Sequence, residues 1–119
     1  MQITGEVVSG LGQGSFYVNK YLPYFETVLG FTCFPGTLNM NVKKKLDFNG
    51  AKKYTIMPTE KDLAQVDCYL VRINDEFDGA IVIPHKTRHG DDIIEVIASV
   101  DLRNTIGLKD GDKITCELV

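Results

Sequence analysis

The sequence of 119 residues lacks any long hydrophobic run, and this absence excludes a typical membrane-spanning helix. Such a helix needs about 20 predominantly apolar residues, and no stretch of the chain approaches that length. The N-terminus also lacks the basic and apolar regions of a signal peptide. We therefore expect no membrane partner.

Cysteine and histidine are scarce, which argues against the frameworks commonly built from them. Cys33, Cys68 and Cys116 are widely spaced and form no C-x-x-C motif. The two histidines, His85 and His89, have no cysteine nearby, so the sequence indicates neither a disulfide framework nor a zinc site. Free thiols fit a reducing compartment, and we expect a cytoplasmic location.

An excess of positive charge is also absent. The formal net charge is −3 and the isoelectric point is near 5.3, so we expect no nucleic-acid partner. The hydrophobic fraction of 44% and the charged fraction of 24% are typical of a globular domain. A chain of 13.3 kDa has room for one core, and we expect residues 1–119 to form a single, monomeric domain.

Two-residue alternation and β-branched residues predict an all-β protein. Asp78-Gly79 predicts a hairpin turn, residues 109–112 predict another turn, and residues 43–65 are expected to form an excursion outside the barrel. Many short strands in a small chain favour a closed barrel, because closure leaves no strand edge exposed. The expected strands are residues 3–8, 37–42, 66–73, 80–83, 93–98 and 113–119.

Helical periodicity appears only twice. The first helix is predicted at residues 21–29, with Pro23 in its first turn, where proline is tolerated. The second is predicted within residues 99–106, with Ser99 or Asp101 as its N-cap.

Residues 10–16 contain three glycines at alternate positions, Gly10, Gly12 and Gly14. Glycine lets a ligand approach bare N–H groups, and a run of such groups can bind an anion. No Gly-Lys-Ser or Gly-Lys-Thr follows, so this is not a P-loop, and the third glycine is one residue too early for the dinucleotide fingerprint. The segment is therefore either an anion-binding loop or a flexible hairpin connection.

The strand expected at residues 37–42 has one apolar face, while Thr37 and Asn39 lie on its polar face. Their side chains are about 6.5 Å apart along the strand, close enough to lean toward one cation. Oxygen donors of this kind suit magnesium. A polar outward face that binds nothing is the alternative.

Taken in order, several motifs resemble the archaeal CTP-dependent riboflavin kinases over nearly the whole chain. Each motif is modest alone, but their order and spacing together are specific. The motifs are GLGQGSF at residues 10–16, PGTLN at 35–39, KTRH at 86–89, IEVIA at 94–98, DLR at 101–103 and LKDGD at 108–112.

This resemblance implies a six-stranded cradle-loop β-barrel, with one or two short helices, that transfers the γ-phosphoryl group of CTP to the 5′-hydroxyl of riboflavin. The products would be FMN and CDP, and the partners would be these nucleotides and flavins together with Mg²⁺. Some family members carry an N-terminal DNA-binding domain. This chain begins directly at the barrel, so we expect no such domain here.

The resemblance also implies roles for individual residues. Thr37 and Asn39 match the magnesium ligands of the family. Thr87 and Glu95 match its flavin contacts, and Glu95 would position the riboflavin hydroxyl or accept its proton as the catalytic residue. Ser99 stands where the family commonly has proline. The implied nucleotide-binding residues are Leu11, Gly12, Gln13, Gly14, Ser15 and Phe16, followed by Val100, Asp101, Leu102, Arg103, Asn104 and Thr105.

Other interpretations stay open for two of these residues and for the whole chain. Arg103 could form a surface ion pair instead of contacting a nucleotide. Glu95 lies on an otherwise apolar strand, where a carboxylate is costly without a partner, but it could also reach water at the strand end. The chain could be a non-catalytic nucleotide or flavin sensor, or a small β-rich DNA-binding regulator, against which the charge of −3 counts.

Overall fold

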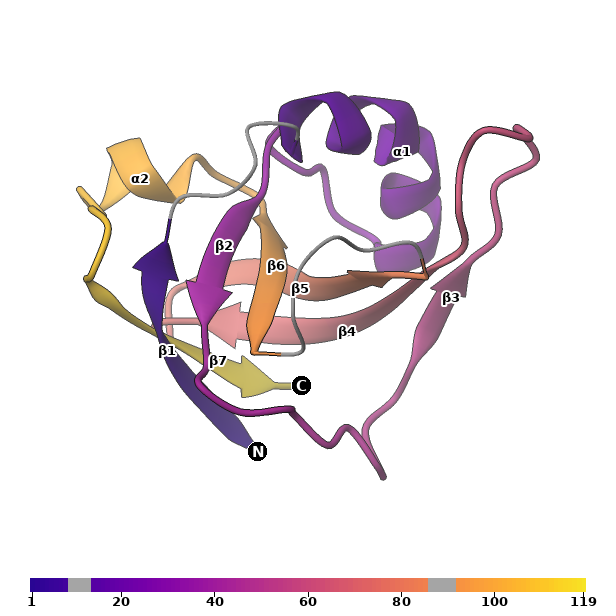
Figure 1. The fold of residues 1–119 in the computed structure, drawn as a ribbon. Helices are drawn as coiled ribbons and strands as arrows, with labels where there is room; N and C mark the ends of the chain where they lie inside the picture. Colours follow the sequence, from indigo (N-terminus) through magenta and orange to yellow (C-terminus); the bar gives the residue numbers. More distant parts are fainter. Residues whose placement is uncertain (9–13, 86–91) are drawn as a thin grey trace.

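The computed structural model describes residues 1–8, 14–85 and 92–119, with the backbone alone for 14–18. The elements follow one another along the chain as drawn in Figure 1. They are β1 (Gln2–Val8), α1 (Gly14–Leu29), β2 (Leu38–Asn41), β3 (Tyr54–Ile56), β4 (Val66–Ile73), β5 (Phe77–Pro84), β6 (Ile93–Ala98), α2 (Leu102–Thr105) and β7 (Lys113–Leu118).

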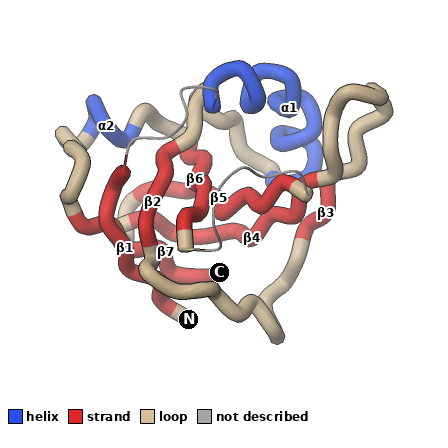
Figure 2. The backbone as a smooth tube through the Cα atoms, viewed as in Figure 1, coloured by secondary structure: helices blue, strands red, loops and turns tan. Residues whose placement is uncertain are grey.

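Six strands close into an antiparallel barrel, as the sequence predicted. The strands neighbour one another in the order β4, β5, β6, β2, β1 and β7, and β7 pairs back onto residues 71–73 of β4. Figure 2 shows these strands as a curved ring with α1 beside it. Closure matters because it leaves the ring without an exposed edge.

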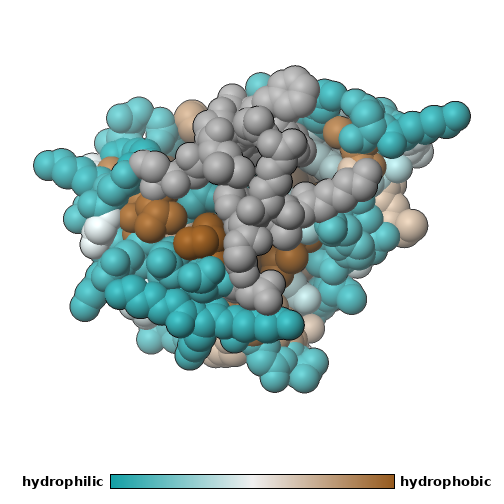
Figure 3. Space-filling model, viewed as in Figure 1, coloured by the Kyte–Doolittle hydropathy of each residue, from teal (hydrophilic) through white to brown (hydrophobic). Residues whose placement is uncertain are grey.

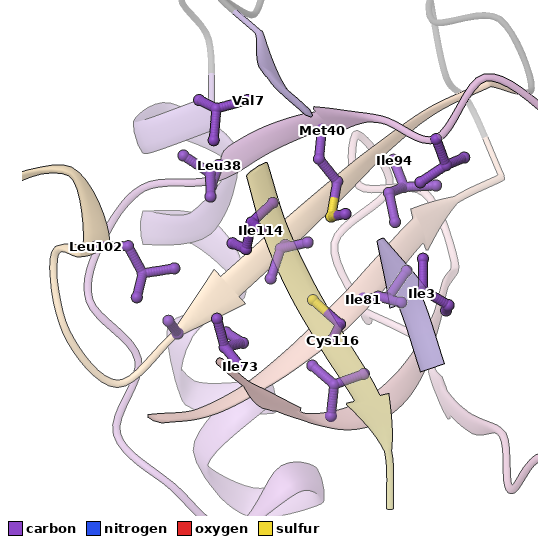
Figure 4. Close-up of a cluster of buried hydrophobic side chains, with 14 of the residues drawn as sticks. Ile3, Val7, Leu38, Met40, Ile73, Ile81, Ile94, Leu102, Ile114 and Cys116 are labelled. Carbon is purple, nitrogen blue, oxygen red and sulfur yellow. The ribbon is translucent and has the colours of Figure 1, made fainter. Parts of the chain in front are cut away.

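The barrel interior is filled by alternate residues of its strands, since successive side chains point to opposite faces. Leu102 of α2 belongs to the same cluster and is 4% exposed, so this helix is anchored in the core. Figure 4 shows the side chains directed toward one another. The labelled members are Ile3, Val7, Leu38, Met40, Ile73, Ile81, Ile94, Leu102, Ile114 and Cys116.

A second apolar cluster lies between α1 and the outer face of the barrel. Tyr21, Phe25 and Leu29 recur every four residues, so they form one buried stripe along the helix. This stripe packs against outward residues of the strands, among them Val82 and Ile97. Strands β4, β5 and β6 are therefore apolar on both faces, whereas most of the surface visible in Figure 3 is hydrophilic.

Helix α1 begins earlier than the sequence predicted. Gly14, Ser15 and Phe16 form its first turn rather than part of a loop, and Pro23 lies inside the helix rather than in its first turn. Proline removes one intrahelical hydrogen bond, but packing of the apolar stripe outweighs that loss. Gly30, at φ 81°, ends the helix by adopting the left-handed conformation that glycine tolerates.

The hairpin between β4 and β5 exists, but its predicted turn at Asp78-Gly79 is wrong. The turn comprises residues 74–76, between the paired residues Ile73 and Phe77, and Asn74 and Asp75 adopt positive φ values of 48° and 58°. Gly79 lies within β5, where an added Cβ would come 2.5 Å from the carbonyl oxygen of Ile97. A glycine is needed at this position because β5 and β6 lie too close together for a side chain there.

Residues 43–65 lie outside the barrel ring, as expected, but they are not without structure. They contain β3, which pairs with residues 66–68 of β4. The following loop is tied to α1, because the Tyr24 hydroxyl donates to Glu60 at 2.6 Å and Lys20 pairs with Asp62 at 2.8 Å. A short strand within a polar sequence gave no periodicity long enough to predict it.

The turn predicted at residues 109–112 is confirmed, and it packs against β1. The Asp112 N–H donates to the Lys109 carbonyl at 3.0 Å, while the Gly111 N–H donates to the Val7 carbonyl at 2.8 Å. Asp101 is the N-cap of α2, one of the two residues predicted for this role. Among the described residues, no helix is both long and apolar enough to cross a membrane.

Candidate functional site

Strands β2 and β6 bring three of the predicted site residues together on the outer face of the barrel. Asn39 and Glu95 are directly opposite each other in the β2–β6 pairing. Both point outward, because their neighbours Met40 and Ile94 fill the interior. Thr37, just before β2, donates its hydroxyl hydrogen to Glu95 Oε1 at 3.4 Å. Residues far apart in the sequence thus form one polar group.

Asn39 is the buried polar residue of the described chain, with an exposed fraction of 8%. Its Oδ1 atom is buried and has no hydrogen-bond partner among the described residues. Leaving such an acceptor unpaired costs about 1–3 kcal/mol. Asn41, two residues along the same face, differs because its Oδ1 accepts from the Lys43 N–H at 2.8 Å. The unpaired amide oxygen of Asn39 therefore points to a ligand.

The donor atoms of this group suit a hard divalent cation. They are a hydroxyl, an amide oxygen and a carboxylate, and Mg²⁺ prefers oxygen ligands. The described part of the chain contains no cluster of three or more His, Cys, Asp or Glu residues that could form a complete protein cage. Magnesium commonly needs only one or two protein ligands, with substrate phosphates supplying others. Thr37 and Asn39 fit that pattern.

Glu95 lies among apolar outward neighbours on its strand. It pairs with Val82 of β5 on one side, and Ile97, two residues along the same face, is buried beneath α1. A carboxylate in such surroundings needs a polar partner, and the Thr37 hydroxyl is one. An ionised carboxylate has two acceptor oxygens, each with more than one hydrogen-bonding site.

The glycine segment follows β1 in the sequence, and the last residue of β1 lies beside the same polar group. Val8, the last residue of β1, pairs directly with Asn39. The first turn of α1, which begins at Gly14, contains no acidic residue. Backbone N–H groups and the dipole at a helix N-terminus favour anions. Ser15 and Phe16 share this turn, whereas Leu11, Gly12 and Gln13 lie outside the described residues.

Arg103 connects the second predicted nucleotide segment to the end of β1. Its Nη2 atom donates to Asp110 Oδ1 at 2.8 Å and to the Val8 carbonyl at 3.5 Å. The surface ion pair considered for Arg103 is therefore present. The same contacts place its guanidinium beside Val8, the last described residue before the glycine segment.

Residues 100–105 divide into anchoring and outward side chains. Leu102 is buried in the barrel core, and Val100 packs against that core. The Asn104 side chain donates to Asp101 Oδ2 at 2.6 Å, so these two polar groups hold each other. Arg103, Asn104 and Thr105 are exposed. The Ser99 N–H donates to the Asp78 carbonyl at 3.1 Å, a bond that proline could not make.

The predicted flavin contact Thr87 lies outside the described residues, but the chain leading to it is held by a polar cluster. His85 Nε2 lies 3.1 Å from Asp67 Oδ2, and the Thr55 hydroxyl donates to Asp67 Oδ1 at 3.1 Å. Partial burial raises the pKa of Asp67, but the hydrogen bonds from His85 and Thr55 outweigh it and hold this pKa below its usual range. No sequence pattern indicates this cluster, because strand pairing alone joins its members.

The three cysteines are buried and unpaired, as the sequence predicted. Burial raises the pKa of Cys33 to about 11 and those of Cys68 and Cys116 to about 12. These thiols stay protonated at neutral pH, so they are packing residues rather than nucleophiles.

Comparison with known proteins shows which family and which relatives this chain matches. Residues 7–118 match the model of the family CTP-dep_RFKase, described as "Domain of unknown function DUF120". A riboflavin kinase of Pyrococcus abyssi is 44% identical over 124 residues, which cover 98% of this chain and 58% of that protein. Riboflavin kinases of Pyrococcus furiosus and Archaeoglobus fulgidus are 44% and 39% identical. They are matched over 94% and 100% of this chain and over 56% and 55% of their own lengths.

Proposed function

Because the chain belongs to the CTP-dependent riboflavin kinase family, we propose that it transfers the γ-phosphoryl group of CTP to the 5′-hydroxyl of riboflavin. The products are FMN and CDP. The observation that carries this proposal is the buried, unpaired amide oxygen of Asn39, which lies opposite Glu95 and beside Thr37. The matched relatives are longer proteins, of which this chain spans a little over half.

The nucleotide is proposed to lie along the end of β1. Backbone N–H groups of residues 11–16, including the first turn of α1, hold its phosphates, and no P-loop lysine is needed for this. Arg103, whose guanidinium reaches the Val8 carbonyl, offsets phosphate charge. Asn104 and Thr105 offer polar groups to the base or ribose.

Thr37 and Asn39 are proposed to hold the divalent cation, which we assign as Mg²⁺. When bound, this ion would neutralise the negative charge that develops on the transferred group. Asn39 contributes its Oδ1 atom, and Thr37 contributes its hydroxyl oxygen while donating to Glu95. The β2–β6 pairing holds Glu95, on the riboflavin side of the site, directly opposite Asn39.

Glu95 and Thr87 are proposed to bind riboflavin. The Glu95 carboxylate accepts a hydrogen bond from the 5′-hydroxyl and directs its oxygen toward the γ-phosphorus. The new bond joins that oxygen to phosphorus, the bond to the bridging oxygen of CDP breaks, and the hydroxyl proton passes to Glu95 or to a phosphate oxygen. Phosphoryl transfer demands positioning more than a strong base, so orientation is the main contribution of Glu95.

A direct assay tests the proposal. The purified protein is mixed with riboflavin, MgCl₂ and either CTP or ATP, and FMN is measured by chromatography. We expect FMN from CTP and much less from ATP. Equal or greater yield from ATP would contradict the nucleotide assignment. No FMN from any nucleoside triphosphate would contradict the kinase and favour a nucleotide or flavin sensor on the same barrel.

A further inference from the structure

Large hydrophobic side chains are exposed at four positions of the described chain, and Phe34 is the aromatic one. Its exposed fraction is 38%, and the others are Met1, Met57 and Val119, two of which are chain ends. Phe34 belongs to neither of the two apolar clusters of the described residues. Single exposed apolar residues are common, so its significance depends on where it lies and how it is held.

The backbone of Phe34 is held in place, and its ring lies close to Gly36. Its N–H donates to the carbonyl of Ala98, at the end of β6, at 2.8 Å. An added Cβ on Gly36 would lie 3.3 Å and 3.7 Å from the Cε1 and Cδ1 atoms of the ring, so the ring packs where glycine leaves room. The exposed ring is therefore presented by a fixed segment.

That segment leads directly into the candidate site. Thr37 follows Gly36 and donates to Glu95, the residue proposed to bind the reacting hydroxyl. Ala98, to which Phe34 is bonded, lies three residues beyond Glu95 on β6, about 10 Å along the strand. An exposed aromatic ring thus lies at the end of the strand that carries the acceptor carboxylate.

We propose that Phe34 stacks against the isoalloxazine ring of riboflavin; this inference rests on the proposed function. In riboflavin, a flexible polyol chain separates the reacting hydroxyl from the flat ring. When the hydroxyl is held at Glu95, the isoalloxazine ring is therefore separated from Glu95 by the length of the polyol chain. This length is of the same order as the distance from Glu95 to the end of β6. Aromatic rings at such a place gain from offset stacking as well as from burial.

The strand order favours the flavin over the cytosine ring as the group that stacks. Strand β2 lies between β1 and β6. Arg103, from the proposed nucleotide segment at residues 100–105, contacts Val8 at the end of β1. Phe34 is bonded to β6, on the opposite side of β2. Phe34 is therefore bonded to the strand that carries the acceptor carboxylate, and not to the strand that Arg103 contacts.

The absence of tryptophan from the chain makes the test specific. An indole stacked on isoalloxazine quenches flavin fluorescence, so Phe34→Trp should strongly quench bound riboflavin. Met57→Trp, at a position 71% exposed on the loop after β3, is the matched control and should cause no additional quenching. Phe34→Ala should raise the riboflavin Kd by about tenfold while changing the CDP Kd little, since stacking on one base-like ring is worth about that much.

The outcomes separate this inference from the proposed function. Phe34→Trp that binds riboflavin without added quenching would overturn the stacking, even if the wild-type protein makes FMN. A response of the new indole to CDP alone would also overturn it and assign Phe34 to the nucleotide. If Phe34→Trp fails to fold, Phe34→Tyr, which adds only a hydroxyl and whose ring also quenches flavins, gives the same readout. Failure of the wild-type protein to bind riboflavin would contradict the function itself.

Discussion

Replacement of Asn39 should not destabilise the ligand-free protein, but it should remove the response of the protein to magnesium. In the structure, Asn39 Oδ1 is buried without a partner among the described residues, at a cost of about 1–3 kcal/mol. Asn39→Ala removes this cost but also removes packing atoms, so the two effects should nearly cancel in the free energy of unfolding. Asn39→Leu, which keeps the branched shape and the number of side-chain heavy atoms, should raise that free energy by up to about 1–3 kcal/mol.

In the presence of CDP and MgCl₂, by contrast, replacement of Asn39 should lower the stability of the protein relative to wild type. A ligand present at 100 times its Kd stabilises the folded state by about 2.7 kcal/mol. For a chain of this size, that corresponds to a rise in Tm on the order of 10 °C. Thermal unfolding is measured without ligand, with CDP, and with CDP and MgCl₂. Both Asn39 variants should lose the part of the shift that MgCl₂ adds, and their FMN formation should fall strongly.

Asn41→Ala is the matched control, because Asn41 lies on the same face of β2 and its Oδ1 already accepts from the Lys43 N–H. It should lose some stability from this turn and keep its magnesium response. Asn39→Ala that is destabilised by 2 kcal/mol or more, about what a broken buried hydrogen bond costs, and that still responds to MgCl₂ would refute the metal assignment. Asn39 would then be a structural residue.

Three further predictions test other parts of the molecule. Gly14→Val places a branched side chain in the first turn of α1. It should weaken CDP binding at least tenfold, about 1.4 kcal/mol, while riboflavin binding changes little, as measured by calorimetric titration. Unchanged CDP affinity would contradict the phosphate site. Leu102→Ala should lower the free energy of unfolding in urea by about 2–5 kcal/mol, since this side chain is buried in the barrel core, and a loss under about 1 kcal/mol would mean that α2 is not anchored there. The lowered pKa of Asp67 means that its ionised form stabilises the fold above the ordinary aspartate pKa and that this contribution disappears as the pH falls through the folded value. Asp67→Asn should therefore cost stability in urea unfolding at pH 7 and much less near pH 2, whereas an equal cost at both would show that the charge is irrelevant.

The sequence by itself determined the class of the fold and the residue types of the site. Alternating apolar residues, as in the strand that contains Met40, fix which face is buried, because a shift of one residue would expose the whole apolar set. Asp101 and Leu29 mark helix ends that local capping and periodicity could predict. The order of the short motifs was specific enough to resemble one family over nearly the whole chain, and the comparisons confirm that family.

Tertiary structure decided what local patterns left ambiguous. Both Asn74-Asp75 and Asp78-Gly79 are turn-like sequences, and close packing of Gly79 against β6 is what places it within the strand. Packing also carries α1 through Pro23 and orders β3 within a polar stretch.

The candidate site depends even more on long-range pairing. Asn39 looks like any outward polar residue in the sequence, and only the β2–β6 register places it opposite Glu95 and leaves its oxygen buried without a partner among the described residues. Likewise, the contact of Arg103 with Val8 and the fixed backbone of Phe34 arise from segments far apart in the chain. Sequence patterns report the nearest neighbours along the backbone, whereas burial and unmet hydrogen bonds are set by the strands that closure of the barrel brings together.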